Sequence, residues 1–83
     1  MRKLQFESQK NIISQTLKLH RIRSGLTQAQ LAARMQTMGI NLDQQMISKI
    51  ESNARLVTDY ELACFCKALR ITPQQLLGAY LEE

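Results

Sequence analysis

The fold is decided by residues 27–51, TQAQLAARMQTMGINLDQQMISKIE. This stretch opens with a capping box, in which the Thr27 hydroxyl accepts the N–H of Gln30 and the Gln30 side chain returns to the N–H of Thr27. Apolar side chains then recur on one face at helical spacing, at Leu31, Ala32 and Met35. The pattern stops near Gly39. The first half of the stretch therefore predicts a helix that begins directly after Thr27.

The second half of the stretch predicts another helix. Asp43 is a good N-cap residue, and the helix that it opens is expected over residues 44–52. The side chains expected to face inward on this helix are Met46, Ile47 and Ile50. Asn53 follows at a position where a left-handed residue can end the helix, and asparagine tolerates that conformation best after glycine.

Upstream of this stretch the sequence predicts one more helix. Residues 9–23 carry side chains at four-residue spacing that fit one helix face, namely Ile13, Leu17 and Arg21. Gly25 follows and can adopt the left-handed C-terminal cap. The first helix is therefore expected over residues 9–23.

Downstream, two further capping boxes begin helices. They lie at residues 58–61 and 72–75, and the second has Pro73 at the favoured first helical position. The side chains expected to face inward on the first of these helices are Leu62, Phe65, Cys66 and Leu69. The last helix is expected to reach about residue 81. The whole pattern predicts an all-α chain of five helices with short connections.

Length and composition restrict the chain to one small domain. Its 83 residues leave no room for two ordinary domains, and 45% apolar residues are typical of a globular chain. One proline and three glycines are too few for a linker, a collagen-like chain or a multi-stranded β domain. We therefore expect an N-terminal extension at residues 1–8 and one helical domain at residues 9–83.

Charge and cysteine content restrict the partners and the cellular compartment that we expect for this protein. Eleven Lys and Arg against seven Asp and Glu give a net charge of +4, which suits a polyanionic partner but is also an ordinary solubility charge. No apolar run approaches about 18 residues, and the basic N-terminus lacks the apolar segment of a signal peptide. Cys64 and Cys66 do not make a disulfide framework. We therefore expect a reduced, cytoplasmic protein with no membrane span.

Four segments in this order resemble the phage-repressor-type, xenobiotic-response-element-like helix-turn-helix family of bacterial and phage regulators. They are TQAQLA at 27–32, ISKIE at 47–51, VTDYEL at 57–62 and KAL at 67–69, and the resemblance extends over residues 11–78. It implies a lambda-repressor-like domain in which helices 2 and 3 form the helix-turn-helix. Residues 35–43 depart from the family pattern, because this connection is several residues longer than usual. Either the second helix runs an extra turn or the connection forms a loop.

The resemblance also implies a function, that of a sequence-specific double-stranded DNA-binding transcriptional repressor. A helix fits the major groove, and its N-terminal side chains reach base edges. The family pattern assigns base contacts to the first, second and sixth positions of the third helix, and Ser48 lies on the same outward face. The expected base contacts are Gln44, Gln45, Lys49 and Ser48. Glutamine can pair with adenine and lysine can donate to guanine, although such side chains can also simply solvate an exposed face.

Phosphate contacts are expected on either side of these residues. The start of the second helix, at Thr27 and Gln28, offers unpaired N–H groups and the positive end of the helix dipole. Gln28 also resembles the family's phosphate-clamping glutamine. The candidates after the third helix are Ser52, Asn53 and Arg55. The alternatives are plain capping by Thr27 and a solvated loop arginine at position 55.

A scaffold ion pair is also implied by the resemblance. The family pairs an arginine late in the first helix with a glutamate late in the third, and Arg21 and Glu51 match those positions. The pair would fix the third helix to the domain. The alternative is two unrelated surface charges, which contribute little.

The sequence does not indicate an enzyme. It has no glycine-rich phosphate loop, no pair of catalytic carboxylates and no Ser-His-Asp set. His20 has no cysteine or acidic cluster beside it, and Cys64 and Cys66 point about 200° apart on a helix, which prevents good chelation. We therefore expect no cofactor, no metal site and no small-molecule site.

The alternative function is a protein-interaction module, or an antitoxin-like partner-binding protein, on the same helical fold. DNA binding, unlike interaction alone, needs basic side chains beside the third helix, for which the candidates are Lys18, Arg23, Arg34 and Arg55. One helix-turn-helix contacts only a half-site, so we expect a homodimer, at least on DNA. The expected dimer contacts are Leu77, Tyr80 and Leu81, with Leu4 and Phe6 as the rival surface.

Overall fold

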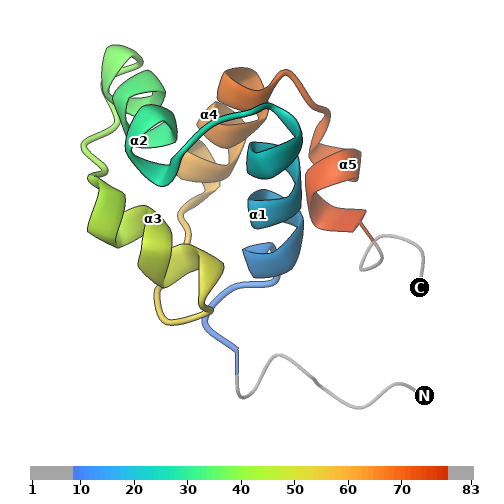
Figure 1. Cartoon of the computed structure of the whole chain (residues 1–83). Coiled ribbons are helices and arrows are strands. Elements are labelled where there is room, and N and C mark those ends of the chain that lie inside the picture. The colour runs from blue at the N-terminus through green and yellow to red at the C-terminus, as the bar shows by residue number, and fades with distance from the viewer. Residues whose placement is uncertain (1–8, 79–83) are drawn as a thin grey trace, which may run out of the picture.

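The computed structural model describes residues 9–78, and its ordered elements are all helices (Figure 1). The bounds are Ser14–Arg23 for α1, Gln28–Thr37 for α2, Gln44–Glu51 for α3, Asp59–Leu69 for α4 and Pro73–Leu77 for α5. The expected all-α, five-helix architecture is confirmed. The extension at residues 1–8, with Leu4 and Phe6, and the dimer candidates Tyr80 and Leu81 lie outside the described residues.

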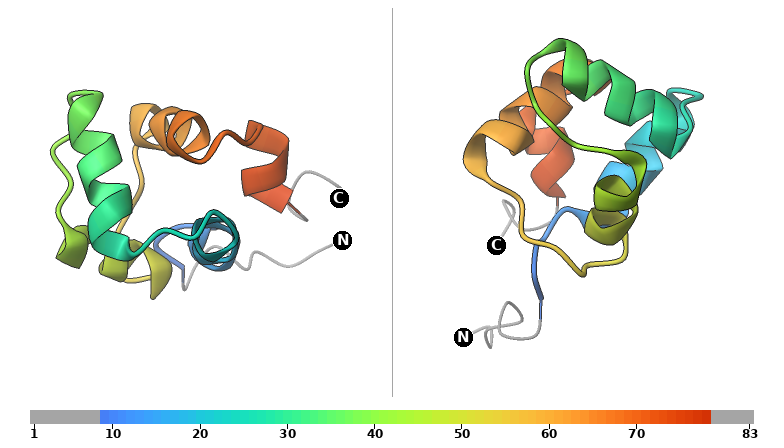
Figure 2. Two further views of the ribbon diagram at one scale, coloured as in Figure 1. Left: turned by 45° about the horizontal axis from the view of Figure 1, so that its top comes forward. Right: turned by 90° about the vertical axis from the view of Figure 1, so that its left-hand side faces the viewer.

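Helix α1 lies at the centre of the arrangement. It packs against α3 on one side and α5 on the other, with α4 across it, and α2 lies along α3 and α4 (Figure 2). The fully buried side chains come from all five helices, from the residue before α1 and from the connection between α2 and α3: Ile13, Leu17, Leu31, Met35, Leu42, Ile47, Ile50, Phe65 and Leu76. Cys66 is buried and Cys64 half-buried, as the helical pattern predicts. One continuous core therefore holds α2 and α3 against the rest of the domain.

The predicted N-caps are present. At α2, α4 and α5 a threonine and the side chain three residues later complete both hydrogen bonds of a capping box. At α3 the Asp43 carboxylate alone accepts the N–H of Met46, at 2.8 Å. These local hydrogen bonds explain why the starts of four helices could be predicted within one residue.

The start of α1 is a correction to the sequence prediction, because the helix begins at Ser14 and not at residue 9. Residues before it are held by tertiary hydrogen bonds instead. Asn53 Oδ1 accepts the backbone N–H groups of Lys10 and Asn11, and Asn11 Nδ2 donates to the carbonyl oxygens of Ile50 and Arg55. These bonds join the approach to α1 to the turn after α3, and the periodicity of residues 9–13 contains no sign of them.

Four helices end in the same way, with a left-handed residue. These are Gly25 after α1, Gly39 after α2, Asn53 after α3 and Arg70 after α4. At each end the residue directly after the left-handed one donates its N–H back to a carbonyl of the last helical turn, as from Ala54 N to Lys49 O and from Ile71 N to Cys66 O. This is the Schellman arrangement. No sequence signal predicts a left-handed residue at Arg70, and at φ 56° its Cβ makes the conformation costly.

The long connection between α2 and α3 forms a loop at residues 38–43. After the left-handed Gly39, the Leu42 side chain enters the core and is only 1% exposed. The Gln36 side chain donates to the Leu42 carbonyl oxygen at 2.9 Å. The loop is therefore attached to the domain through both a side chain and the backbone, and it sets the direction in which α3 begins.

We predict that Arg70→Gly stabilises the protein and that Asn53→Gly destabilises it. Glycine relieves the left-handed strain at position 70, where the arginine side chain makes no hydrogen bond or ion pair within residues 9–78, for a gain of about 0.5–1 kcal/mol. At position 53 the same change removes two hydrogen bonds to the segment before α1, at a cost of about 1–2 kcal/mol. Urea unfolding measures the change in the free energy of unfolding of each variant, and the m-value is expected to stay the same. Changes of the same sign in the free energy of unfolding of the two variants would contradict this prediction.

Candidate nucleic-acid interface

The outer face of α3 is the surface that the sequence assigned to base contacts. Ile47 and Ile50 on its inner face are fully buried. The four predicted base-contacting side chains are all exposed on its other side: Gln44, Gln45, Ser48 and Lys49. An eight-residue helix is too short to be stable alone, so its packing presents these groups in a fixed register.

The predicted partners Arg21 and Glu51 meet in a buried ion pair. Arg21 Nε donates to Glu51 Oε2 at 2.6 Å, and its Nη2 donates to Oε1 at 3.1 Å. The remaining guanidinium nitrogen donates to the Leu26 carbonyl oxygen at 2.7 Å. The two side chains are only 11% and 4% exposed. A two-point contact at this burial ties α3 to the end of α1.

Gln28 adds α2 to this contact. Its Nε2 donates to Glu51 Oε1 at 3.0 Å, and its side chain is half-buried. Thr27 beside it is exposed, and its hydroxyl accepts the N–H of Gln30 in the capping box. The Glu51 carboxylate therefore contacts α1 and the first turn of α2 at once, which sets α2 and α3 relative to each other.

The three candidates after α3 are held by the protein's own groups. Ser52 is exposed and its hydroxyl donates to the Lys49 carbonyl oxygen. Asn53 holds the segment before α1 through its side-chain oxygen. Arg55 is half-buried and donates to both oxygens of Glu61, at 3.0 and 3.1 Å. Their contact with phosphate stays a prediction, and in the free protein Asn53 and Arg55 act as structural residues.

The Arg55–Glu61 pair was missed from the sequence. Desolvation opposes ionisation of the buried Glu61, but hydrogen bonds from Arg55 and Thr58 outweigh it and hold the pKa of Glu61 below its ordinary value. The hydrogen bond to Glu61 likewise raises the pKa of Arg55. The sequence assigns Glu61 to a capping box alone, and Arg55 lies six positions before it in a loop, so no helical spacing reveals the pair.

The basic side chains of the described residues differ in whether an acidic side chain neutralises them. Arg21 and Arg55 are neutralised by buried carboxylates. Lys18, Arg23 and Lys49 are exposed and have no acidic partner within residues 9–78. Arg34 is exposed, and its guanidinium donates to the Ala68 carbonyl oxygen at the end of α4. The uncompensated positive charge of the described residues therefore lies on side chains that water, or a polyanion, can reach.

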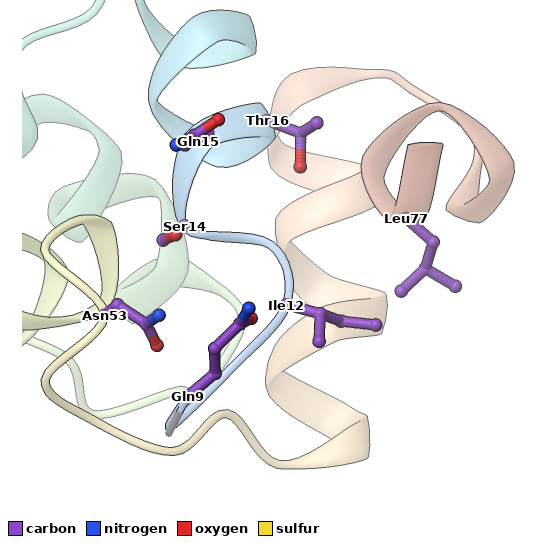
Figure 3. A pocket seen from close by; sticks show the side chains of 7 residues that line it. All are labelled: Gln9, Ile12, Ser14, Gln15, Thr16, Asn53 and Leu77. Carbon is purple, nitrogen blue, oxygen red and sulfur yellow. The ribbon is translucent and has the colours of Figure 1, made fainter. Parts of the chain in front are cut away.

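A separate hollow of about 230 Å³ lies between the approach to α1, the turn after α3 and α5 (Figure 3). Its walls are uncharged: Gln9, Ile12, Ser14, Gln15, Thr16, Asn53 and Leu77. The dimer candidate Leu77 is half-buried here. Over residues 9–78 no cluster of three metal-ligating side chains is found, and no helix there is long and apolar enough to cross a membrane.

Comparison with models of known protein families gives a match over most of the chain. A sequence model of a family described as helix-turn-helix matches residues 17–76, which is more than half of the chain. The matched range contains α2, α3 and α4 together with every residue assigned above to base, phosphate or scaffold contacts. A search of curated proteins found no match.

We predict that Arg21→Met and Glu51→Gln each destabilise the protein by about 3 kcal/mol, because each leaves a buried polar partner uncompensated. The double variant is expected to cost clearly less than the sum. Combining Arg21→Met with Glu61→Gln provides the control, since these residues share no partner and their effects should add. Additivity within the Arg21–Glu51 cycle would show that the two side chains do not stabilise each other.

Acid should weaken the fold partly through Glu61. Because the pKa of Glu61 is lowered on folding, its contribution is complete above the unfolded value of about 4.3 and is lost as pH falls through the folded value. Unfolding free energies measured from pH 6 down to pH 3 should therefore fall more steeply for the wild type than for Glu61→Gln. If the free energy of unfolding falls equally steeply with pH in the two proteins, the pKa of Glu61 is not lowered on folding.

Proposed function

Because the chain belongs to the phage-repressor-type helix-turn-helix family of DNA-binding regulators, we propose that it is a sequence-specific repressor that inserts α3 into the major groove. The observation that carries this proposal is the exposed polar face of α3, whose opposite face is locked into the core. A helix anchored in this way presents side chains to base edges without the entropic cost of ordering the helix backbone on binding.

The chemistry of that face suits base edges. Gln44 and Gln45 stand in the first turn of α3, and each offers one donor and one acceptor that match the N6 and N7 positions of adenine. Lys49 is one turn further along and can donate to the N7 and O6 positions of guanine. Ser48 between them offers a hydroxyl that suits several bases.

Phosphate contacts follow from the same placement. Gln28 uses one amide hydrogen on Glu51, and a side-chain amide carries two, so the second is available to a phosphate oxygen. Exposed Thr27 and the first turn of α2 add backbone N–H groups. Ser52, Asn53 and Arg55 are the proposed contacts at the other end of α3, where binding by Arg55 would have to share its guanidinium with Glu61.

The wider proposal is a cytoplasmic, non-enzymatic regulator that binds its operator as a homodimer. Two half-sites about one helical turn apart place two copies of α3 on one side of the duplex. Leu77, Tyr80 and Leu81 are the proposed dimer contacts.

A partner-binding function on the same fold is the competing proposal. The observation that favours it is the exposure of Leu56 and Tyr60, at 68% and 60%, close to the start of α4. Such side chains suit a protein interface, although single exposed apolar residues are common on monomers. The DNA titration below separates the two functions.

We predict duplex binding whose affinity falls steeply with salt, with a log–log slope of about −0.9 for each phosphate neutralised. Gln44→Ala, Gln45→Ala or Lys49→Ala should each lower affinity for a selected site by about 1–3 kcal/mol and relax preference at one base pair. Binding to unrelated duplex should change little for the two glutamine variants.

The matched control is Gln74→Ala, which removes an exposed glutamine from α5. It should leave both affinity and base preference as they are. Sedimentation of the protein with a palindromic duplex checks for two copies per site. Absence of any salt-dependent duplex binding would refute the repressor proposal and favour the competing proposal of partner binding.

A further inference from the structure

The N-cap of α3 carries a charge that the DNA-binding proposal does not explain. The other side-chain caps in residues 9–78 are threonines, whereas α3 is capped by exposed Asp43, immediately before Gln44 and Gln45. Serine, threonine or asparagine would cap the helix about as well without a charge. Capping alone therefore does not require a carboxylate at this position.

Only half of the Asp43 carboxylate is engaged. Oδ1 accepts the N–H of Met46, and within the described part of the chain Oδ2 has neither a hydrogen-bond donor nor a basic partner. The other two carboxylates that lie close to α3 or the turn after it, Glu51 and Glu61, are both paired with arginine. Asp43 therefore presents one unsatisfied acceptor and one negative charge beside the proposed base-contacting side chains.

A negative charge at this place repels phosphates and so weakens DNA binding, and a donor on a base edge can compensate this loss. In the major groove the only donors are the amino groups of cytosine N4 and adenine N6. Adenine also presents the N7 acceptor beside its amino group, and guanine and thymine present acceptors, which repel a carboxylate. Cytosine itself presents no acceptor in the major groove, and only the O6 of its paired guanine lies beside its amino group, whereas adenine N6 lies between N7 and the O4 of its paired thymine.

We propose that Asp43 is a specificity-determining residue whose Oδ2 accepts a hydrogen bond from cytosine N4 at the edge of the half-site. This inference rests on the proposed DNA-binding function and adds a base contact outside the four residues of the α3 face. The same carboxylate thus begins the helix with one oxygen and selects a base with the other. The charge penalises every duplex that lacks the cytosine, which sharpens discrimination without adding affinity elsewhere.

The test is to select the duplexes that bind from a library of randomised sequences and to compare the base preferences. The proteins compared are the wild-type full chain and two variants that still cap α3. In Asp43→Asn the oxygen remains on Met46 and the outward group becomes an NH₂ donor, so cytosine preference should change to bases that present an acceptor. In Asp43→Ser no outward group remains, and preference at that base pair should vanish. A discrimination of about 5- to 150-fold for cytosine is expected in the wild type.

Asp59→Asn is the matched control, because it removes the same charge from an exposed position in the first turn of α4. It should leave the base profile unchanged, whereas both Asp43 variants should bind unrelated duplex more tightly than the wild type. Thermal unfolding checks that the caps survive. Identical base profiles for the wild type, Asp43→Asn and Asp43→Ser would overturn this inference and leave the proposed function standing. A wild type that binds no duplex would overturn both.

Discussion

The carboxylate of Glu51 joins three helices, and the geometry of the proposed DNA-binding surface depends on it. It accepts two hydrogen bonds from Arg21 of α1 and one from Gln28 of α2 while it belongs to α3. A buried charge is tolerated only when it is paired and hydrogen-bonded. Removing either member of the Arg21–Glu51 pair therefore destabilises the protein. Since α3 is too short to hold its own shape, this contact and the burial of Ile47 and Ile50 determine where its outer face points.

The positive charge of the chain is divided between scaffold and surface. Two arginines form ion pairs within the fold, because Arg21 fixes α3 through Glu51 and Arg55 fixes the start of α4 through Glu61. The exposed Lys18, Arg23 and Lys49 are left for long-range attraction of a polyanion. A count of lysines and arginines therefore overstates what a phosphate backbone meets, and neutral donors such as the Gln28 amide become correspondingly important.

The connections act as parts of the scaffold. Buried Leu42 anchors the α2–α3 loop, and Asn53 ends α3 while it holds the residues that approach α1. Left-handed residues at four helix ends turn the chain sharply, which lets five short helices share one core. The strain at Arg70 is tolerated because the surrounding hydrogen bonds and the packing of α4 maintain that turn.

Local signals in the sequence determined the all-α class, the helix starts at residues 28, 44, 59 and 73, and the exposed face of α3, because capping boxes and helical spacing act within a few residues. Family resemblance supplied the Arg21–Glu51 pairing, which no local rule contains. Tertiary structure alone decided the late start of α1, the Arg55–Glu61 pair, the contact of Gln28 with Glu51 and the course of residues 38–43. Each of these features depends on groups that only packing brings together. The hydrogen bonds from Asn11 to Ile50 and Arg55 show the reason, because the bonded residues lie about forty positions apart in the sequence, beyond the reach of any periodic pattern.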